Sequence, residues 1–110
     1  MPEDKGGLLK LKLNFIGKLL FVAPVATPGT NEVWMQNTAF VPSTKTISVG
    51  TTITWTNKDN ADHDVTSNSG LFISPTMGKN ATFSYKFDAI GTYDYKCTFH
   101  SGMTGKIIVQ

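Results

Sequence analysis

The chain has 110 residues and a mass of 12.0 kDa, enough for one domain around one hydrophobic core. Its hydrophobic fraction of 40% and aromatic fraction of 11% are typical of a globular protein and exclude a disordered one. All ten basic residues are lysines, and the net charge of +2 comes from the first 30 residues, since the remainder is neutral. A neutral body without arginine argues against binding of nucleic acid, which needs clustered cations.

The first 31 residues form an extension that can be interpreted in more than one way. The apolar stretch Leu19–Ala26, preceded by lysines, is consistent with a signal-peptide remnant or an anchor. The alternation of apolar residues with Lys and Asn from Leu9 to Phe15 instead predicts an added strand. An amphipathic helix is the weakest interpretation, because the lysines do not fall on one face. No run of about 18 uncharged apolar residues is present, so we expect membrane association only through this extension.

Residues 32–110 are expected to form one domain made of short strands. The turn-forming residues Gly, Pro, Asn and Asp separate segments with period-2 alternation, which are Val33–Phe40, Thr44–Val49, Thr51–Trp55, His63–Ser67, Thr82–Phe87, Thr92–Cys97 and Lys106–Val109. Gly50 predicts a hairpin between the second and third of these segments, and Tyr93 resembles the tyrosine corner of Greek-key sandwiches. The pattern predicts an all-β, Greek-key β-sandwich, with the extension as an added strand if it is not a targeting segment.

The residues that carry chemistry are concentrated near the C-terminus. Cys97 is the only cysteine, and it is followed by His100 and Met103 in C-x2-H-x2-M spacing. The other histidine of the chain, His63, lies 34 residues before the cysteine. One thiolate, two imidazoles and a thioether are the ligand set of a type 1 copper site, in which the soft sulfur donors hold Cu(I) and imidazole suits both oxidation states.

Each of these residues also has an ordinary interpretation. A lone Cys in a β-protein is usually a small buried hydrophobic residue, a lone His in a turn is usually just solvated, and Met103 could fill the core. Cys97 and His100 could form a Cys–His hydrolase pair, although residues three apart on a tight loop converge on a shared point more readily than they orient a nucleophile against a base. A zinc site built from His63, Cys97 and His100 is a further alternative, although structural zinc favours several cysteines.

Two stretches of the chain resemble cupredoxins, the blue copper proteins of the amicyanin/plastocyanin-like family. These are Gly91–Val109, and Gly50–Asn57 together with the His63-Asp64-Val65 string. The resemblance covers residues 33–110 and fills all four ligand positions. It implies one type 1 copper per chain, with Cys97 as the strongly coupled thiolate, His63 as the buried imidazole, His100 as the exposed imidazole and Met103 as the weak axial ligand.

The sequence departs from the family pattern at two places. Many cupredoxins have Asn directly after the first histidine, whereas this chain has Asp64, whose carboxylate can accept a hydrogen bond from Thr98 but cannot donate one. Amicyanin has Pro on both sides of the exposed histidine, whereas this chain has Phe99 and Ser101. We expect the charge of Asp64 to favour Cu(II) and to lower the reduction potential.

The resemblance implies a small one-electron carrier that passes electrons from a donor protein to an acceptor protein. It implies no enzyme, and a nitrite reductase or multicopper oxidase is disfavoured because a single copper uses both histidines and leaves none for a second, catalytic copper. Cupredoxins of this kind resemble exported proteins, so we expect the periplasm or the outer cell surface. Candidate docking-patch residues near the exposed histidine are Phe99, Gly102, Pro75 and Met77, for which packing of the loops is an equally weighted alternative. The alternatives are a copper-trafficking protein with the same ligands and a metal-free interaction module.

Overall fold

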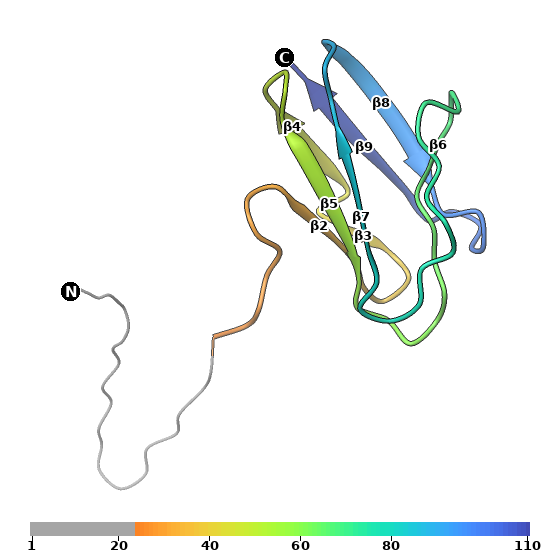
Figure 1. Ribbon diagram of the computed structural model, residues 1–110. Helices are drawn as coiled ribbons and strands as arrows, with labels where there is room; N and C mark the ends of the chain where they lie inside the picture. The colour runs from red at the N-terminus through yellow and green to blue at the C-terminus, as the bar shows by residue number, and fades with distance from the viewer. Residues whose placement is uncertain (1–23) are drawn as a thin grey trace, which may run out of the picture.

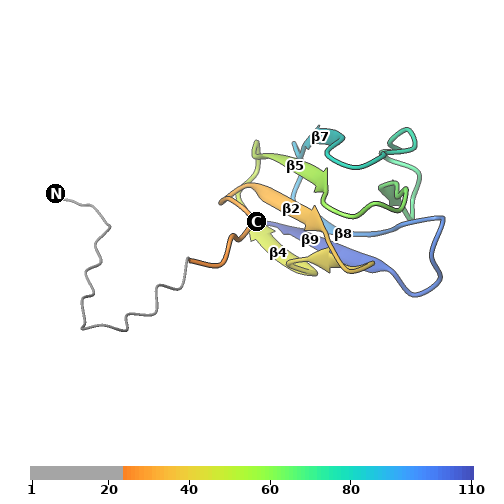
Figure 2. The same ribbon diagram turned by 90° about the horizontal axis from the view of Figure 1, so that it is seen from below.

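The computed structural model describes residues 24–110, which form a sandwich of two four-stranded β-sheets (Figure 1). One sheet has the order β3-β2-β5-β7, with β2 at Glu32–Met35, β3 at Phe40–Val41, β5 at Thr52–Asn57 and β7 at Thr82–Lys86. The other has the order β4-β9-β8-β6, with β4 at Thr44–Ile47, β6 at Thr66–Ser67, β8 at Gly91–Lys96 and β9 at Thr104–Val109. Seen from below, the two sheets lie one over the other (Figure 2). The predicted all-β sandwich is confirmed.

The N-terminal interpretations can be followed only in part. The strand predicted from Leu9 to Phe15 lies outside the described residues, as does most of the apolar stretch from Leu19 onward. Residues 24–31 form no strand. The division of the chain at residue 31 stays a prediction.

The core lies between the sheets because alternate residues of the strands face inward. Trp55 of β5 is fully buried and packs edge-to-face on Tyr95 of β8, with ring centroids 5.4 Å apart. On β8 the inward positions continue past the strand end to Cys97, whereas Asp94 and Lys96 are exposed. The tyrosine corner is confirmed, because the Tyr93 hydroxyl donates to the Ala89 carbonyl oxygen at 2.7 Å.

The hairpin predicted at Gly50 is wrong. β4 pairs in parallel with β9, whereas β5 pairs with β2 and β7, so the turn at Gly50 carries the chain from one sheet to the other. Gly50 has a φ of +90°, and its N–H donates to the Phe87 carbonyl oxygen at 2.6 Å. The alternation on either side is equally compatible with a crossover, because Ile47 and Ile53 are both buried between the sheets.

The strand predicted over Val33–Phe40 is in fact a hairpin of β2 and β3. The chain reverses at Asn37 and Thr38, which have φ of 55° and 57°, and Gln36 and Ala39 exchange backbone hydrogen bonds across the turn. Two residues with positive φ are typical of a type I′ hairpin turn, for which Asn-Gly is the preferred sequence. With Thr in place of Gly, the sequence pattern does not mark this turn.

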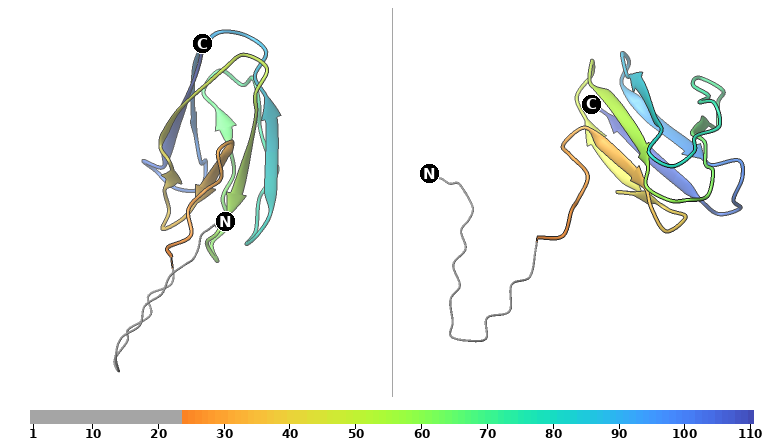
Figure 3. Two further views of the ribbon diagram at one scale, coloured as in Figure 1. Left: turned by 90° about the vertical axis from the view of Figure 1, so that its left-hand side faces the viewer. Right: turned by 60° about the horizontal axis from the view of Figure 1, so that its bottom comes forward.

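The loops that carry the candidate ligands meet at one end of the sandwich. β5 ends at Asn57 and β8 ends at Lys96, and the loop from β8 to β9 lies at the end opposite the C-terminus (Figures 1 and 3). The strand predicted at His63–Ser67 is shortened to β6, although His63 forms an isolated bridge with Met77 in the loop that precedes β7. Segments distant in the sequence are thereby placed around one point.

Candidate metal centre

The loop after β8 folds tightly back on itself. Cys97 continues the inward alternation of β8 and is buried, with 3% of its surface exposed. Its backbone N–H donates to the Met103 carbonyl oxygen at 3.0 Å, and the Met103 N–H donates to the His100 carbonyl oxygen at 3.2 Å. Gly102 has a φ of +83°, a conformation that residues with a side chain rarely adopt. The glycine therefore permits the chain to reverse its direction between His100 and Met103. The loop therefore holds Cys97, His100 and Met103 in one compact unit.

His63 enters the site from the other side. It is fully buried, and its backbone forms two hydrogen bonds with the backbone of Met77. The His63 N–H donates to the Met77 carbonyl oxygen at 3.1 Å, and the Met77 N–H donates to the His63 carbonyl oxygen at 2.8 Å. The side chain of buried Asn57 donates to the carbonyl oxygens of Ala61 and Met77, both at 2.9 Å. These contacts fix the backbone on both flanks of the histidine.

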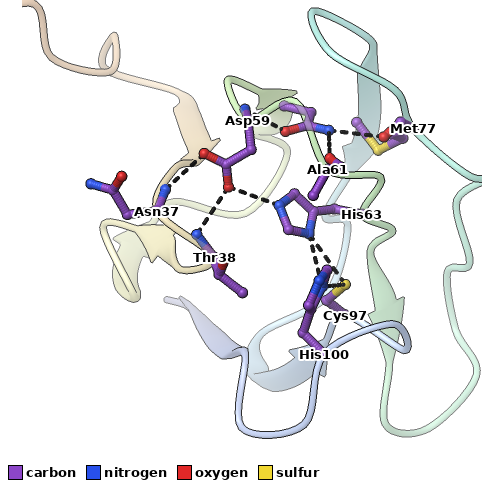
Figure 4. A network of polar contacts seen from close by, with 9 residues as sticks. Asn37, Thr38, Asp59, Ala61, His63, Met77, Cys97 and His100 are labelled. Carbon is purple, nitrogen blue, oxygen red and sulfur yellow. Dashed lines mark hydrogen bonds and ion pairs between the residues drawn. The ribbon is translucent and has the colours of Figure 1, made fainter.

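The three strongest donors converge on one point (Figure 4). The Cys97 Sγ lies 3.7 Å from the His63 Nδ1 and 3.6 Å from the His100 Nδ1, and the two Nδ1 atoms are 3.2 Å apart. Ligand atoms about 2.0–2.3 Å from a shared ion are about 3.2–3.8 Å from one another when the angles between them at the ion are about 105–120°. The triangle therefore fits a single metal ion bound through Sγ and two Nδ1 atoms.

The chemistry of the donors indicates which ion it is. One thiolate with two imidazoles is the trigonal set of type 1 copper, and the buried Met103, with 3% of its surface exposed, stands in the same loop to supply a thioether. Structural zinc would call for more cysteines than this chain possesses. His100 is only half-buried, whereas His63 is sealed from solvent, as the resemblance implied.

Asp59 is a residue of the site that the sequence analysis did not single out. The His63 Nε2 donates to the Asp59 Oδ2 at 2.9 Å, and the amides of Asn37 and Thr38 donate to the same carboxylate at 2.8 and 2.9 Å (Figure 4). Partial burial raises the pKa of Asp59, but the hydrogen bonds from Thr38, His63 and Asn37 outweigh it and hold this pKa below its ordinary value. A carboxylate four residues before a ligand histidine was the available signal, because ligand histidines commonly donate their second N–H to a carboxylate.

Asp64 and Thr98 make the contact expected of them. The Asp64 carboxylate accepts the Thr98 backbone N–H at 2.6 Å and the Thr98 hydroxyl at 2.5 Å. Asp64 is buried, with 8% of its surface exposed. The residue after His63 is thereby tied to the residue after Cys97.

The four candidate docking residues do not share one environment. Phe99 is 51% exposed, and Gly102 and Pro75 are also exposed. Met77 is only 1% exposed and belongs to the hydrophobic core, so its inclusion in a surface patch is wrong. Its apolar side chain packs inward because its backbone is bridged to the buried His63.

Comparison with known proteins agrees with this site. The family model for the cupredoxin-like domain matches residues 15–109. Amicyanin-alpha of Methylorubrum extorquens is 38% identical over 90 residues, covering 77% of this chain and 76% of that protein. The reduced state of an amicyanin mutant superposes with a TM-score of 0.70 at 33% identity, over 74% of this chain and 83% of that one. A purple cupredoxin from Nitrosopumilus maritimus gives a TM-score of 0.66 at 30% identity, over 72% of this chain and 98% of that one. The match to most of the chain, together with the His63, Cys97, His100 and Met103 set, shows that this protein belongs to the cupredoxin family.

Proposed function

We propose that the protein is a small one-electron carrier with a single type 1 copper bound by His63, Cys97, His100 and Met103. The observation that carries the proposal is the triangle of Cys97 Sγ and two imidazole Nδ1 atoms at the end of a rigid sandwich. When bound, copper supplies the Cu(I)/Cu(II) couple. The proposed role is that of a carrier and not of an enzyme, because the only two histidines both belong to this one centre and leave none for a second, catalytic copper.

The protein's contribution is to hold the ligands still. His63 is fixed through its backbone by Met77 and through its Nε2 by Asp59, and Cys97 is held by Met103. Side chains that are already oriented reorganise little when the charge of the bound ion changes, which favours fast electron transfer. Met103 would supply a weakly bound thioether that contributes to the potential.

His100 is the proposed exit point for the electron. It is the less buried of the two imidazoles, and it borders a surface cavity of about 390 Å³ lined by residues 96–98 and 100–104. The exposed Phe99 beside it, with Gly102 and Pro75, would form the surface that a donor or acceptor protein covers. The body is neutral in charge, which suits docking through apolar contact around one histidine.

The proposed location is the periplasm or the outer cell surface, where a redox protein donor and acceptor would be met. This follows from the resemblance to exported cupredoxins and from the apolar, lysine-bearing extension at the N-terminus. Within residues 24–110 no helix is long and apolar enough to cross a bilayer.

The test is the optical spectrum of the full chain after addition of Cu(II) to the metal-free protein. An electron carrier gives a stable, intense blue band that is lost in Cys97→Ser, and the colour disappears and returns on reduction and oxidation. Colourless Cu(I) binding with rapid loss of metal to a chelator would instead identify a copper-trafficking protein. A chain that binds no copper, or a Cys97→Ser variant that keeps the blue band, would overturn the assignment.

A further inference from the structure

Asp59 occupies an unusual position between the candidate metal centre and the β2–β3 turn. Its Oδ1 accepts the Asn37 N–H, while its Oδ2 accepts both the Thr38 N–H and the His63 Nε2–H. The Asp59 backbone is also held, because its own N–H donates to the Asn57 Oδ1 at 2.8 Å. Three hydrogen bonds to the carboxylate and one from the backbone leave this side chain little freedom (Figure 4).

The turn that supplies two of these donors is itself strained. Asn37 and Thr38 both have positive φ, a conformation that Asn tolerates but that is unfavourable for a β-branched residue such as Thr. The left-handed turn aims two successive amides at one carboxylate. Strain of this kind persists where the surrounding structure imposes it, and it gathers at functional sites.

From this arrangement we infer that Asp59 is a positioning residue, which fixes the tautomer and the orientation of the His63 ring before metal is bound. A proton held on Nε2 by Asp59 leaves the Nδ1 lone pair free, and Nδ1 is the atom that faces Cys97 Sγ and His100. The β2–β3 turn is thereby part of the metal centre, although it supplies no ligand. This inference rests on the proposed copper function and deepens it.

The hydrogen bond between Asp59 and His63 also bears on the reduction potential. A carboxylate that accepts the second N–H of a ligand histidine makes the imidazole a stronger donor, and residues in this role typically change metal affinity by about 10–100-fold. The stronger donor favours Cu(II) over the softer Cu(I). Loss of Asp59 therefore weakens Cu(II) binding more than Cu(I) binding and raises the potential, by about 59 mV for each tenfold difference between the two affinities.

The experiment compares Asp59→Ala and Asp59→Asn with the full-length wild type, using Asp62→Asn as the matched control. Asp62 is exposed and adjacent to His63 in the chain, so its substitution removes the same charge without removing the contact to Nε2. The first readout is long-range ¹⁵N NMR of the metal-free protein at neutral pH, which reports the histidine tautomers directly. The second is the pair of Cu(I) and Cu(II) affinities, with the potential.

The wild type and Asp62→Asn should show His63 protonated at Nε2 alone, and Asp59→Ala should show both tautomers and bind Cu(II) about 10–100-fold more weakly. Asp59→Asn retains an acceptor for Nε2, so it should keep the tautomer and raise the potential more than Asp62→Asn does. If Asp59→Ala does not fold, the inference is tested by comparing the potentials of Asp59→Asn and Asp62→Asn. The inference is overturned if Asp59→Ala keeps the wild-type tautomer, or if Asp59→Asn and Asp62→Asn shift the potential equally. A wild type that forms no blue centre would contradict the proposed function, while the NMR result would still stand by itself.

Discussion

Thr98 donates both its backbone N–H and its side-chain hydroxyl to the carboxylate of Asp64, 34 residues earlier in the chain. Asp64 follows His63, and Thr98 follows Cys97, so this pair of hydrogen bonds joins the two loops that supply ligands. Because the donor residue and the acceptor residue each lie next to a ligand in the chain, the two hydrogen bonds hold the ligand loops at a fixed separation. Asp64 also places a carboxylate directly after a residue that would bind the metal ion.

The first prediction concerns that charge. Asp64→Asn should raise the reduction potential, because a nearby negative charge stabilises Cu(II) relative to Cu(I) by an energy on the order of 1 kcal/mol in a partly buried site. The fold should survive, because the Asn oxygen still accepts the Thr98 N–H and the Thr98 hydroxyl can turn to accept from the new amide. Voltammetry on both proteins measures the shift.

The control for this prediction is Asp88→Asn, which removes an exposed acid paired with Lys86 at 2.9 Å on the surface. It should leave the potential unchanged, since exposed charges are well screened. Absence of a rise in Asp64→Asn, or an equal rise in both variants, would show that the carboxylate serves only to join the loops.

The sequence predicts the site better than it predicts the strand pairing. Cys97, His100 and Met103 lie in one loop, and His63 is the only remaining histidine, so the ligand set could be read from spacing and from family resemblance. Asp59 is marked in the sequence only by its position four residues before His63, because its other two partners are backbone amides of a turn more than 20 residues away. The spacing of residues along one segment shows which of its side chains can meet. It carries no information about backbone N–H donors from a distant turn.

The same reason explains the errors in the fold. Alternation shows which residues face the core, and it correctly buries Tyr95 and Cys97. It does not show which strand lies alongside, because Ile47 and Ile53 would be equally buried in a hairpin or in a crossover between sheets. β4 pairs with β9 near the far end of the chain, a partner that no local pattern at Gly50 indicates.

The second prediction concerns the strained turn. Thr38→Gly should increase the free energy of unfolding by about 0.5–1 kcal/mol, because glycine relieves the strain of a positive φ but adds entropy to the unfolded chain. The backbone N–H that Thr38 donates to Asp59 remains in the variant. Urea unfolding of the metal-free protein measures the change, and the blue spectrum of the loaded protein should be retained.

Thr38→Ala provides the comparison for this prediction. Alanine removes the β-branch but still carries a Cβ in the left-handed region, so its gain in stability should be smaller than that of glycine. A Thr38→Gly variant that is less stable than wild type would mean that the threonine side chain contributes contacts that outweigh the backbone strain.

The third prediction concerns the contact between Gly105 and Tyr95, which face each other across β8 and β9. A Cβ at position 105 would overlap the Cζ and Oη atoms of Tyr95. The ring packs on Phe40 and Trp55, so it cannot move away from a new Cβ. The site is closed enough that burial raises the pKa of the Tyr95 hydroxyl to about 12. Gly105→Ala should therefore reduce stability by about 1–3 kcal/mol, as overpacked cores do. Gly78→Ala, whose Cβ would make only an ordinary contact with Asp62 at 3.6 Å, should change it little, and equal stabilities of the two variants would contradict the packing argument.

The last prediction concerns the pH dependence of stability at Glu32, on the first strand of the sandwich. The Gly29 amide, which donates to Oε1 at 2.9 Å, is the main cause that lowers the pKa of this carboxyl, and partial burial opposes it less strongly. The Thr56 hydroxyl donates to Oε2 at 2.9 Å and lowers the pKa further. A carboxyl whose pKa is lower in the folded state than in the unfolded state stabilises the fold above its ordinary pKa of about 4.5, and this contribution is lost as the pH falls through the lower, folded value.

Glu32→Gln should therefore be less stable than wild type at pH 7, by roughly 0.5–1.5 kcal/mol for a charge-assisted hydrogen bond on a partly exposed group. The difference should shrink as the pH falls below 4.5 and vanish once the wild-type carboxyl is protonated. Unfolding curves of the metal-free protein between pH 3 and pH 7 measure it, and the exposed-acid variant Asp88→Asn should track the wild type over the same range because its ion pair with Lys86 is exposed. A difference between Glu32→Gln and wild type that stays constant with pH would show that the substitution disturbs packing rather than removing a carboxylate stabilised by the Gly29 and Thr56 donors.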